Sequence, residues 1–177
     1  SVSAQSVRKY LDALDRVGVL EELPAWRPHL RSAVRLRVRP TWHFVDPSLA
    51  AVGLDASATT LLDDPRTLGF LFESLAIRDL RVYAETMGGT VGRYRDERGL
   101  EVDAIIELPN GRWAAIEIKL GGDTAIERAA TNLQRLASQV SVERAKRLAG
   151  LAVITAGTTS LRRRDGVAVI ALGHLTA

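Results

Sequence analysis

Cysteine is absent from this 177-residue sequence, and so is any long uncharged apolar run. Without cysteine, a disulfide framework, a thiolate metal site and a cysteine nucleophile are excluded. A membrane-spanning helix needs roughly 20 consecutive apolar residues, and the mixed polar N-terminus differs from the apolar core of a signal peptide. We therefore expect a cytoplasmic protein with no membrane partner.

Lysine is scarce as well: Lys9, Lys119 and Lys146 are the only lysines among 24 basic residues. The formal net charge is nevertheless +3, and a hydrophobic content of 46% is ample for a sizeable core. Arginine carries a planar guanidinium and lysine a compact ammonium, and the two are not interchangeable. A lysine at a chemically important position therefore needs a specific reason. An initiator methionine is also missing at Ser1, which leads us to expect a fragment of a longer protein.

The first residues predict an amphipathic helix followed by a short strand. Ser3 is a suitable N-cap, and Gly18 supplies the left-handed residue that ends the helix. Arg8 and Lys9 lie on its polar side. The apolar stripe of the helix is formed by Val7, Tyr10, Leu11, Leu14 and Val17.

No acidic residue occurs between Trp26 and Val45, and residues 34–39 alternate apolar and basic. A strand there would present its guanidinium groups on one face. Helix, short strand, loop and basic strand follow one another as in the second half of a winged helix-turn-helix; the alternative is an ordinary solvated strand face. Nucleic acid phosphates are then expected to bind five residues: Arg8, Lys9, Arg35, Arg37 and Arg39.

The stretch from Asp46 to Asp64 is rich in turn signals and weakly patterned. We place the domain boundary in it, with a partial winged-helix domain over 1–50 and a second domain over 51–177. His29 and His43 are too isolated to argue for a metal site, and we interpret them as structural or surface residues.

A helix is predicted from Pro65 to about Thr86, with Asp64 as its N-cap. Glu73 lies in one of its apolar stripes, and a carboxylate in such a setting is costly unless a cation, a metal or a hydrogen-bond donor meets it. The alternative is a glutamate at the rim that pairs with an arginine.

Three strands follow, and their expected ranges are 90–95, 100–108 and 112–120. The last two form a hairpin whose Leu108-Pro109-Asn110-Gly111 turn predicts a three-residue loop with Gly111 in the left-handed conformation. This loop pairs Leu108 with Arg112.

Continuing this ladder sets Asp103 opposite Glu117 and Glu101 opposite Lys119, all on one face because side chains alternate. The other face is expected to be apolar and to contain Val102, Ala104, Ile106, Ile116 and Ile118. Two facing carboxylates repel each other, so positive charge is needed between them, from Lys119 and from a divalent cation that prefers carboxylate oxygens. An aspartate followed after thirteen residues by Glu-x-Lys is the arrangement that a metal-dependent phosphodiesterase needs.

The remaining elements complete an α/β pattern. A helix capped by Asp123 is expected to reach about residue 140, followed by strands over 151–155 and 167–172. A meander followed by a crossover helix predicts a mixed sheet with helices on both faces.

This succession resembles the restriction-endonuclease-like PD-(D/E)XK superfamily, whose αβββαβ core is a helix, a three-stranded meander, a helix and a strand. The whole chain also resembles the C-terminal region, a partial winged helix and a nuclease-like domain, that follows the ATPase domain in many prokaryotic AAA-type ATPases. The matching stretches are Val7-Arg8-Lys9-Tyr10-Leu11, Phe44-Val45-Asp46-Pro47, Gly69-Phe70-Leu71-Phe72-Glu73, Tyr94-Arg95, Glu101-Val102-Asp103 and Ile116-Glu117-Ile118-Lys119.

The resemblance implies a role for each residue of the motif. Asp103, Glu117 and the Ile118 carbonyl would bind Mg²⁺ or Mn²⁺, Lys119 would be the catalytic lysine, and Glu73 would support the metal or its water. It also implies an ATPase domain upstream of Ser1, since this chain has no Gly-x-x-x-x-Gly-Lys-[Ser/Thr] phosphate loop.

Three functions follow as hypotheses. The first is a Mg²⁺-dependent nuclease domain that acts on DNA. The second is a non-catalytic module of the same fold that binds nucleic acid or a partner protein and regulates the ATPase. The third is a winged-helix regulator whose second domain is structural.

Overall fold

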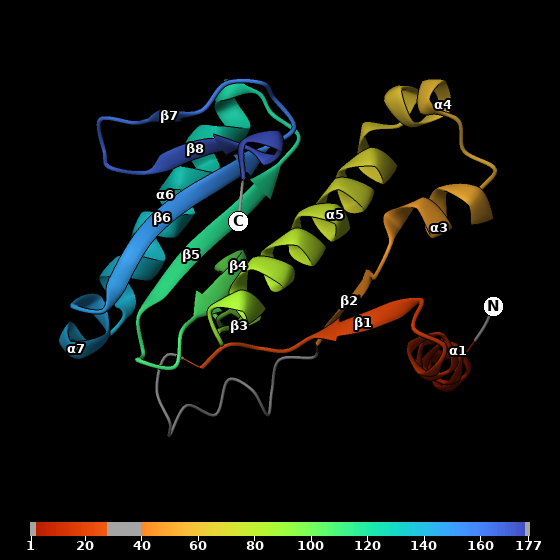
Figure 1. The fold of residues 1–177 in the computed structure, drawn as a ribbon, viewed down its shortest axis with the longest axis horizontal. Coiled ribbons are helices and arrows are strands. Elements are labelled where there is room, and N and C mark those ends of the chain that lie inside the picture. Colours follow the sequence, from red (N-terminus) through yellow and green to blue (C-terminus); the bar gives the residue numbers. More distant parts are fainter. Residues whose placement is uncertain (1–2, 28–39, 176–177) are drawn as a thin grey trace.

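A six-stranded mixed sheet dominates the computed structural model, which describes residues 3–27 and 40–175 (Figure 1). The strand order is β3-β4-β5-β6-β8-β7; β3, β4 and β5 form an antiparallel meander, and β6 runs parallel to both β5 and β8. The expected α/β class is therefore confirmed. The strands are β3 (Thr90–Arg95), β4 (Glu101–Glu107), β5 (Trp113–Lys119), β6 (Leu148–Thr155), β7 (Leu161–Arg162) and β8 (Ala168–Ala171).

Two long helices cover opposite faces of this sheet and create two apolar cores. Helix α5 (Pro65–Thr86) packs Ile77 and its neighbours against one face, and α6 (Asp123–Gln139) packs Leu133 and its neighbours against the other. The N-cap of α5 is Asp64, whose side chain accepts from Thr67 N at 3.2 Å, as its Asp-Pro start predicts. The sequence α5, β3, β4, β5, α6, β6 is the expected helix, meander, helix and strand.

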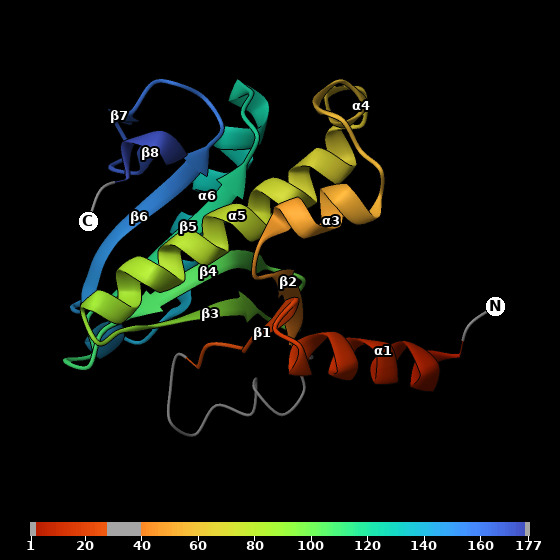
Figure 2. The same cartoon turned by 45° about the vertical axis from the view of Figure 1, so that its right-hand side comes forward.

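The N-terminal residues form α1 (Ala4–Arg16) and a two-stranded sheet of β1 (Leu20–Leu23) and β2 (Thr41–Phe44). Ser3 caps α1 and Gly18 has a φ of 71°, as predicted. No residue of α1 is buried, and Figure 2 shows this helix projecting away from the sheet. The predicted basic strand, with Arg35, Arg37 and Arg39, lies outside the described residues, as does His29.

The stretch that is rich in turn signals contains two short helices, α3 (Pro47–Gly53) and α4 (Ala58–Asp63). Asp46 and Ser57 cap them through their side chains. The prediction missed these helices because they are only seven and six residues long, which is too short for a clear helical periodicity of apolar residues. The boundary near residue 50 stays a prediction, and residue 50 itself lies within α3.

The C-terminal part differs from the prediction in details of its boundaries. The N-cap of α6 is Gly122 with a φ of 89°, so the prediction of Asp123 as the cap was wrong; Asp123 is the first helical residue. A separate turn of helix, α7 (Val142–Ala145), follows α6, and the 3₁₀ helix η1 (Leu172–His174) follows β8.

None of the helices in the described ranges is long and apolar enough to cross a membrane.

Candidate active site

The β4–β5 hairpin has the register that its turn predicts. Gly111 has a φ of 78°, and its N–H donates to the Leu108 carbonyl at 2.8 Å. The Leu108 N–H donates to the Arg112 carbonyl at 2.8 Å, and the ladder continues to Ala104 opposite Ile116. One further step along both strands brings Asp103 opposite Glu117.

The apolar face of the hairpin is largely as expected. Ala104, Ile116 and Ile118 belong to the core under α5, and Ile106 packs against it. Val102 instead lies in the core on the α6 side, so its assignment was wrong. The β3–β4 register shifts between Gly92 and Tyr94, and such an irregularity turns nearby side chains to the other face.

Lys119 joins the two facing carboxylates. Its Nζ donates to Asp103 Oδ2 at 2.8 Å and pairs with Glu117 Oε2 at 2.6 Å. The Ile118 N–H also donates to Asp103 Oδ2, at 2.8 Å, and the Asn132 amide of α6 donates to Glu117 Oε1 at 3.2 Å. These donors hold both carboxylates at the end of β5, where Glu117 is only 2% exposed.

Glu73 of α5 is a third carboxylate, on which the charges of Asp103 and Lys119 act. Burial, reinforced by the charge of Asp103, raises the pKa of Glu73 to about 7. The same two causes raise the pKa of Glu117 to about 7. Burial alone would lower the pKa of Lys119, but the Asp103 and Glu117 carboxylates outweigh it and hold that pKa above its usual range. The cluster of Glu73, Asp103, Glu117 and Lys119 therefore contains three acidic groups and one basic group, and the raised pKa values of Glu73 and Glu117 let these carboxyls hold protons near neutral pH.

His43 of β2 also reaches this cluster, which the sequence did not predict. Its Nδ1 lies 3.4 Å from Ser74 Oγ, and its Nε2 lies 3.9 Å from Glu73 Oε1. Burial, with smaller effects of the Arg81 and Arg93 charges, lowers the pKa of His43 to about 4. The imidazole is thus neutral at pH 7. His43 and Ser74 are 31 residues apart, so no local signal could reveal this contact.

The oxygen atoms of this cluster are suitable ligands for a hard cation, but Lys119 lies between two of the carboxylates. Carboxylate oxygens with excess negative charge suit Mg²⁺ or Mn²⁺. Among residues 3–27 and 40–175, however, no three acidic or histidine side chains are arranged to hold a metal ion. The Lys119 ammonium lies between the Asp103 and Glu117 carboxylates, so a metal can enter only if these side chains rearrange.

The other residues singled out by the sequence have varied surroundings. The Nε atom of Arg8, on α1, lies 3.4 Å from the Oδ1 atom of Asp12 on an exposed surface, and Lys9 is exposed. Tyr94 packs edge-on to Trp26 with ring centroids 6.2 Å apart. Glu101 pairs with Arg95 at 2.8 Å.

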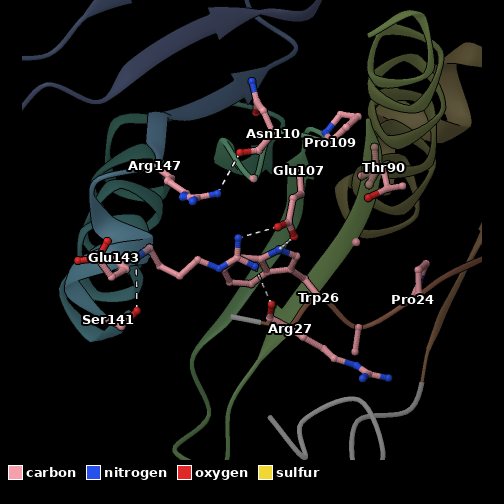
Figure 3. Close-up of a pocket in the computed structure, with 15 residues that line it drawn as sticks. Pro24, Trp26, Arg27, Thr90, Glu107, Pro109, Asn110, Ser141, Glu143 and Arg147 are labelled. Carbon is pink, nitrogen blue, oxygen red and sulfur yellow. Dashed lines mark hydrogen bonds and ion pairs between the residues drawn. The ribbon is translucent and has the colours of Figure 1, made fainter. Parts of the chain in front are cut away.

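A cavity of about 900 Å³ opens at the other end of the hairpin, next to its turn (Figure 3). Within it Glu107 accepts hydrogen bonds from Trp26 Nε1 at 2.7 Å and from Arg144 Nη1 at 2.6 Å. Glu107 is four residues from Asp103, which is about 14 Å along a strand. The cavity and the carboxylate cluster are therefore separate features. The cavity is lined by Pro24, Ala25, Trp26, Arg27, Thr90, Val91, Gly92, Glu107, Pro109, Asn110, Gly111, Ser141, Glu143, Arg144 and Arg147.

Comparison with known proteins gives two family matches. Residues 68–175 match the family described as Domain of unknown function (DUF4143), and residues 1–60 match Domain of unknown function (DUF8612). No curated protein and no solved structure matches the chain. The first match spans more than half of the chain and includes Glu73, Asp103, Glu117 and Lys119. The chain therefore belongs to the DUF4143 family.

Proposed function

We propose that this protein is a divalent-metal-dependent nuclease that hydrolyses phosphodiester bonds of DNA. The observation that carries the proposal is the contact of Lys119 Nζ with Asp103 at 2.8 Å and with Glu117 at 2.6 Å, two residues whose cluster also acts electrostatically on the Glu73 carboxylate. A lysine and several carboxylates at the end of one hairpin are the side chains that metal-assisted phosphodiester hydrolysis requires.

Each residue of the cluster has a proposed role. Asp103, Glu117 and the Ile118 carbonyl would hold Mg²⁺ or Mn²⁺, and Glu73 would bind the metal or its water. Such an ion would supply Lewis-acid polarisation of the phosphate and a lower pKa for a water molecule. Lys119 orients that water or the phosphate as a point charge, while Asn132 and the Ile118 N–H keep Glu117 and Asp103 in place. A Glu73 carboxyl with a pKa near 7 can exchange a proton at neutral pH.

The proposed setting is a cytoplasmic protein with an AAA-type ATPase domain upstream and a restriction-endonuclease-like PD-(D/E)XK domain in this chain. Its order of helix, meander, helix and strand supports the proposal. DNA is then guided by a partial winged helix. The residues proposed to contact its phosphates are Arg8, Lys9, Arg35, Arg37 and Arg39.

Plasmid cleavage tests this function. With Mg²⁺ or Mn²⁺ the purified protein should nick supercoiled DNA, and Asp103→Asn and Glu117→Gln should each reduce the rate at least about 100-fold. Glu143→Gln is the matched control, because the Glu143 side chain is 80% exposed and pairs only with Lys146 among the described residues. Cleavage that survives in Asp103→Asn would be a contaminant's activity and would end the proposal.

A second candidate is a non-catalytic module that binds nucleic acid or a partner protein and regulates the ATPase. It is favoured by Lys119, whose ammonium already satisfies Asp103 and Glu117 without a metal. Calorimetry distinguishes the two functions. Absence of Mg²⁺ and Mn²⁺ binding together with salt-sensitive DNA binding supports this second function, whereas metal binding with a 1:1 or 2:1 ratio supports the nuclease.

A further inference from the structure

The β1–β2 sheet is fastened to α5, which carries Glu73, and to β3, which pairs with β4. Arg93 of β3 donates a hydrogen bond to Thr41 Oγ1 of β2. Arg81 of α5 forms an ion pair with Glu21 of β1 and donates to the Glu22 carbonyl at 2.6 Å. Contacts from two separate elements thus fix the orientation of the β1–β2 sheet.

One buried polar atom of this sheet has no partner. His43 is 5% exposed, and among the described residues its Nε2 atom is buried without a hydrogen bond. A buried ring nitrogen without a partner is destabilising, and native proteins rarely leave one without a reason. The Glu73 Oε1 atom lies 3.9 Å from it, just beyond hydrogen-bond distance.

The roles of His43 and Ser74 in their contact depend on which ring nitrogen carries the proton. The ring is neutral at pH 7 because burial lowers its pKa. When the Ser74 hydroxyl donates to Nδ1, which lies 3.4 Å from Ser74 Oγ, the proton resides on Nε2. The Nε2–H group then faces a carboxylate oxygen, so a small side-chain rotation closes a hydrogen bond.

We infer that His43 is a positioning residue of the candidate active site: its Nε2–H donates to the Glu73 carboxylate and keeps it facing Asp103 and Lys119. One oxygen of Glu73 is oriented in this way, and the other stays available to a metal ion or its water. The N-terminal sheet therefore completes a centre that α5, β4 and β5 build. The role of Glu73 toward a metal rests on the proposed function, whereas the hydrogen bond itself does not.

The tautomer of His43 tests the hydrogen bond independently of any activity. Long-range ¹H–¹⁵N correlation spectra of the full chain at pH 8, where most Glu73 is ionised, should show the Nε2–H form, with a slowly exchanging ring proton. Replacement of the acceptor in Glu73→Met should shift this signal and speed its exchange. A proton on Nδ1, or a signal unchanged in Glu73→Met, overturns the inference.

Two substitutions of His43 test its effect on the site. His43→Phe keeps the ring volume without a donor, and His43→Gln keeps an N–H donor. Mn²⁺ titration calorimetry should show about tenfold weaker binding for His43→Phe and less than about threefold for His43→Gln, since partners of metal ligands typically contribute 10- to 100-fold in affinity. For DNA cleavage, His43→Phe should lower kcat and leave KM unchanged.

The outcomes separate the two proposals. Equal Mn²⁺ affinity of His43→Phe and the wild type overturns the positioning role. If the wild type neither binds Mn²⁺ nor cleaves DNA, the proposed function fails, and the tautomer spectrum alone decides on the hydrogen bond between His43 and Glu73. The same spectrum decides if His43→Phe does not fold.

Discussion

The two ends of the β4–β5 hairpin carry partly or fully buried carboxylates in opposite electrostatic settings. Next to the turn, Glu107 binds one guanidinium, that of Arg144, and the indole N–H of Trp26, so both of its oxygens are bonded. At the far end Asp103 and Glu117 share the one ammonium of Lys119, and Glu73 adds further negative charge. A carboxylate with its own cation stabilises the fold, whereas carboxylates that share one cation also repel each other.

The basic residues at the two ends differ for the same reason. The Arg144 guanidinium lies 5.2 Å from the Trp26 ring centroid and also donates to the Arg27 carbonyl at 3.1 Å. A planar guanidinium with several N–H donors can make a stacking contact and hydrogen bonds at the same time. Lys119 is a compact charge that contacts two carboxylates. Exchange of Lys119 for arginine would therefore not conserve the chemistry.

The largest effect on stability is expected at the turn end. Arg144→Ala should lower the free energy of unfolding by about 2 to 3 kcal/mol, because it leaves the partly buried Glu107 carboxylate without its cation. Urea unfolding followed by tryptophan fluorescence measures this change. Arg147→Ala, which removes only the hydrogen bond to the Asn110 carbonyl, should cost less than about 1 kcal/mol. A loss below 1 kcal/mol for Arg144→Ala would contradict a structural role for this end.

At the carboxylate cluster, a substitution is expected to raise the free energy of unfolding and not to lower it. The folded protein holds a proton on Glu117 up to a pKa of about 7, well above the ordinary 4.5, so the metal-free protein should lose stability as the pH rises from about 5 to 8. Glu117→Gln removes the part of this loss that Glu117 causes, while Glu73 keeps its own, and the variant should be more stable than the wild type at pH 8 by about 1 to 2 kcal/mol. Urea unfolding at both pH values checks this, with Glu143→Gln as the exposed control. Equal pH dependence of the wild type and Glu117→Gln would refute it.

Metal affinity should rise with pH, whereas the stability of the metal-free protein should fall. A cation must displace protons from carboxyls whose pKa values lie near 7, so Mn²⁺ affinity should rise between pH 6 and 8 by about tenfold for each proton displaced, equivalent to about 1.4 kcal/mol per proton. Calorimetry in two buffers of different ionisation enthalpy counts the protons released. Arg144→Lys, a change at the turn end, should leave this pH dependence intact; a pH-independent affinity would rule out protonated Glu73 and Glu117.

The smallest effect is expected at the turn that connects the two ends. Gly111→Ala forces a side chain to adopt a φ of 78° and should cost about 1 kcal/mol. Gly150→Ala is a suitable control, because a Cβ there has no neighbour within 4 Å and the backbone is not left-handed. Both are measured by urea unfolding, and equal losses in the two variants would show that the turn conformation does not matter.

The sequence predicts those parts of the fold that depend on neighbouring residues. The range of α5 follows from its capping pair and periodicity, and the hairpin register follows from the Pro-Asn-Gly turn. Once the register is known, period-two alternation brings together Asp103, Glu117 and Lys119. Half of the candidate site is therefore encoded within seventeen residues of the chain.

The remainder depends on contacts that no local pattern contains. His43 reaches Glu73 only because β2 packs against α5. Val102 packs in the core on the α6 side, and not in the expected core under α5, because β3 and β4 shift register near Gly92. The closure of the site by Lys119 depends on side-chain rotamers, which spacing does not determine.

The chain segment after β1 also protects the sheet from other molecules. It runs beside β3, where Arg93 N donates to the Pro24 carbonyl at 2.8 Å and Trp26 N donates to the Arg93 carbonyl at 2.7 Å. Gly92 permits this approach, since a Cβ there would lie 3.0 Å from the Pro24 carbonyl oxygen. Unpaired edge strands recruit other chains and promote aggregation. Because this segment bonds to β3 at Arg93 and the opposite edge is only the two-residue β7, the described part of the sheet presents a shorter template for intermolecular strand addition.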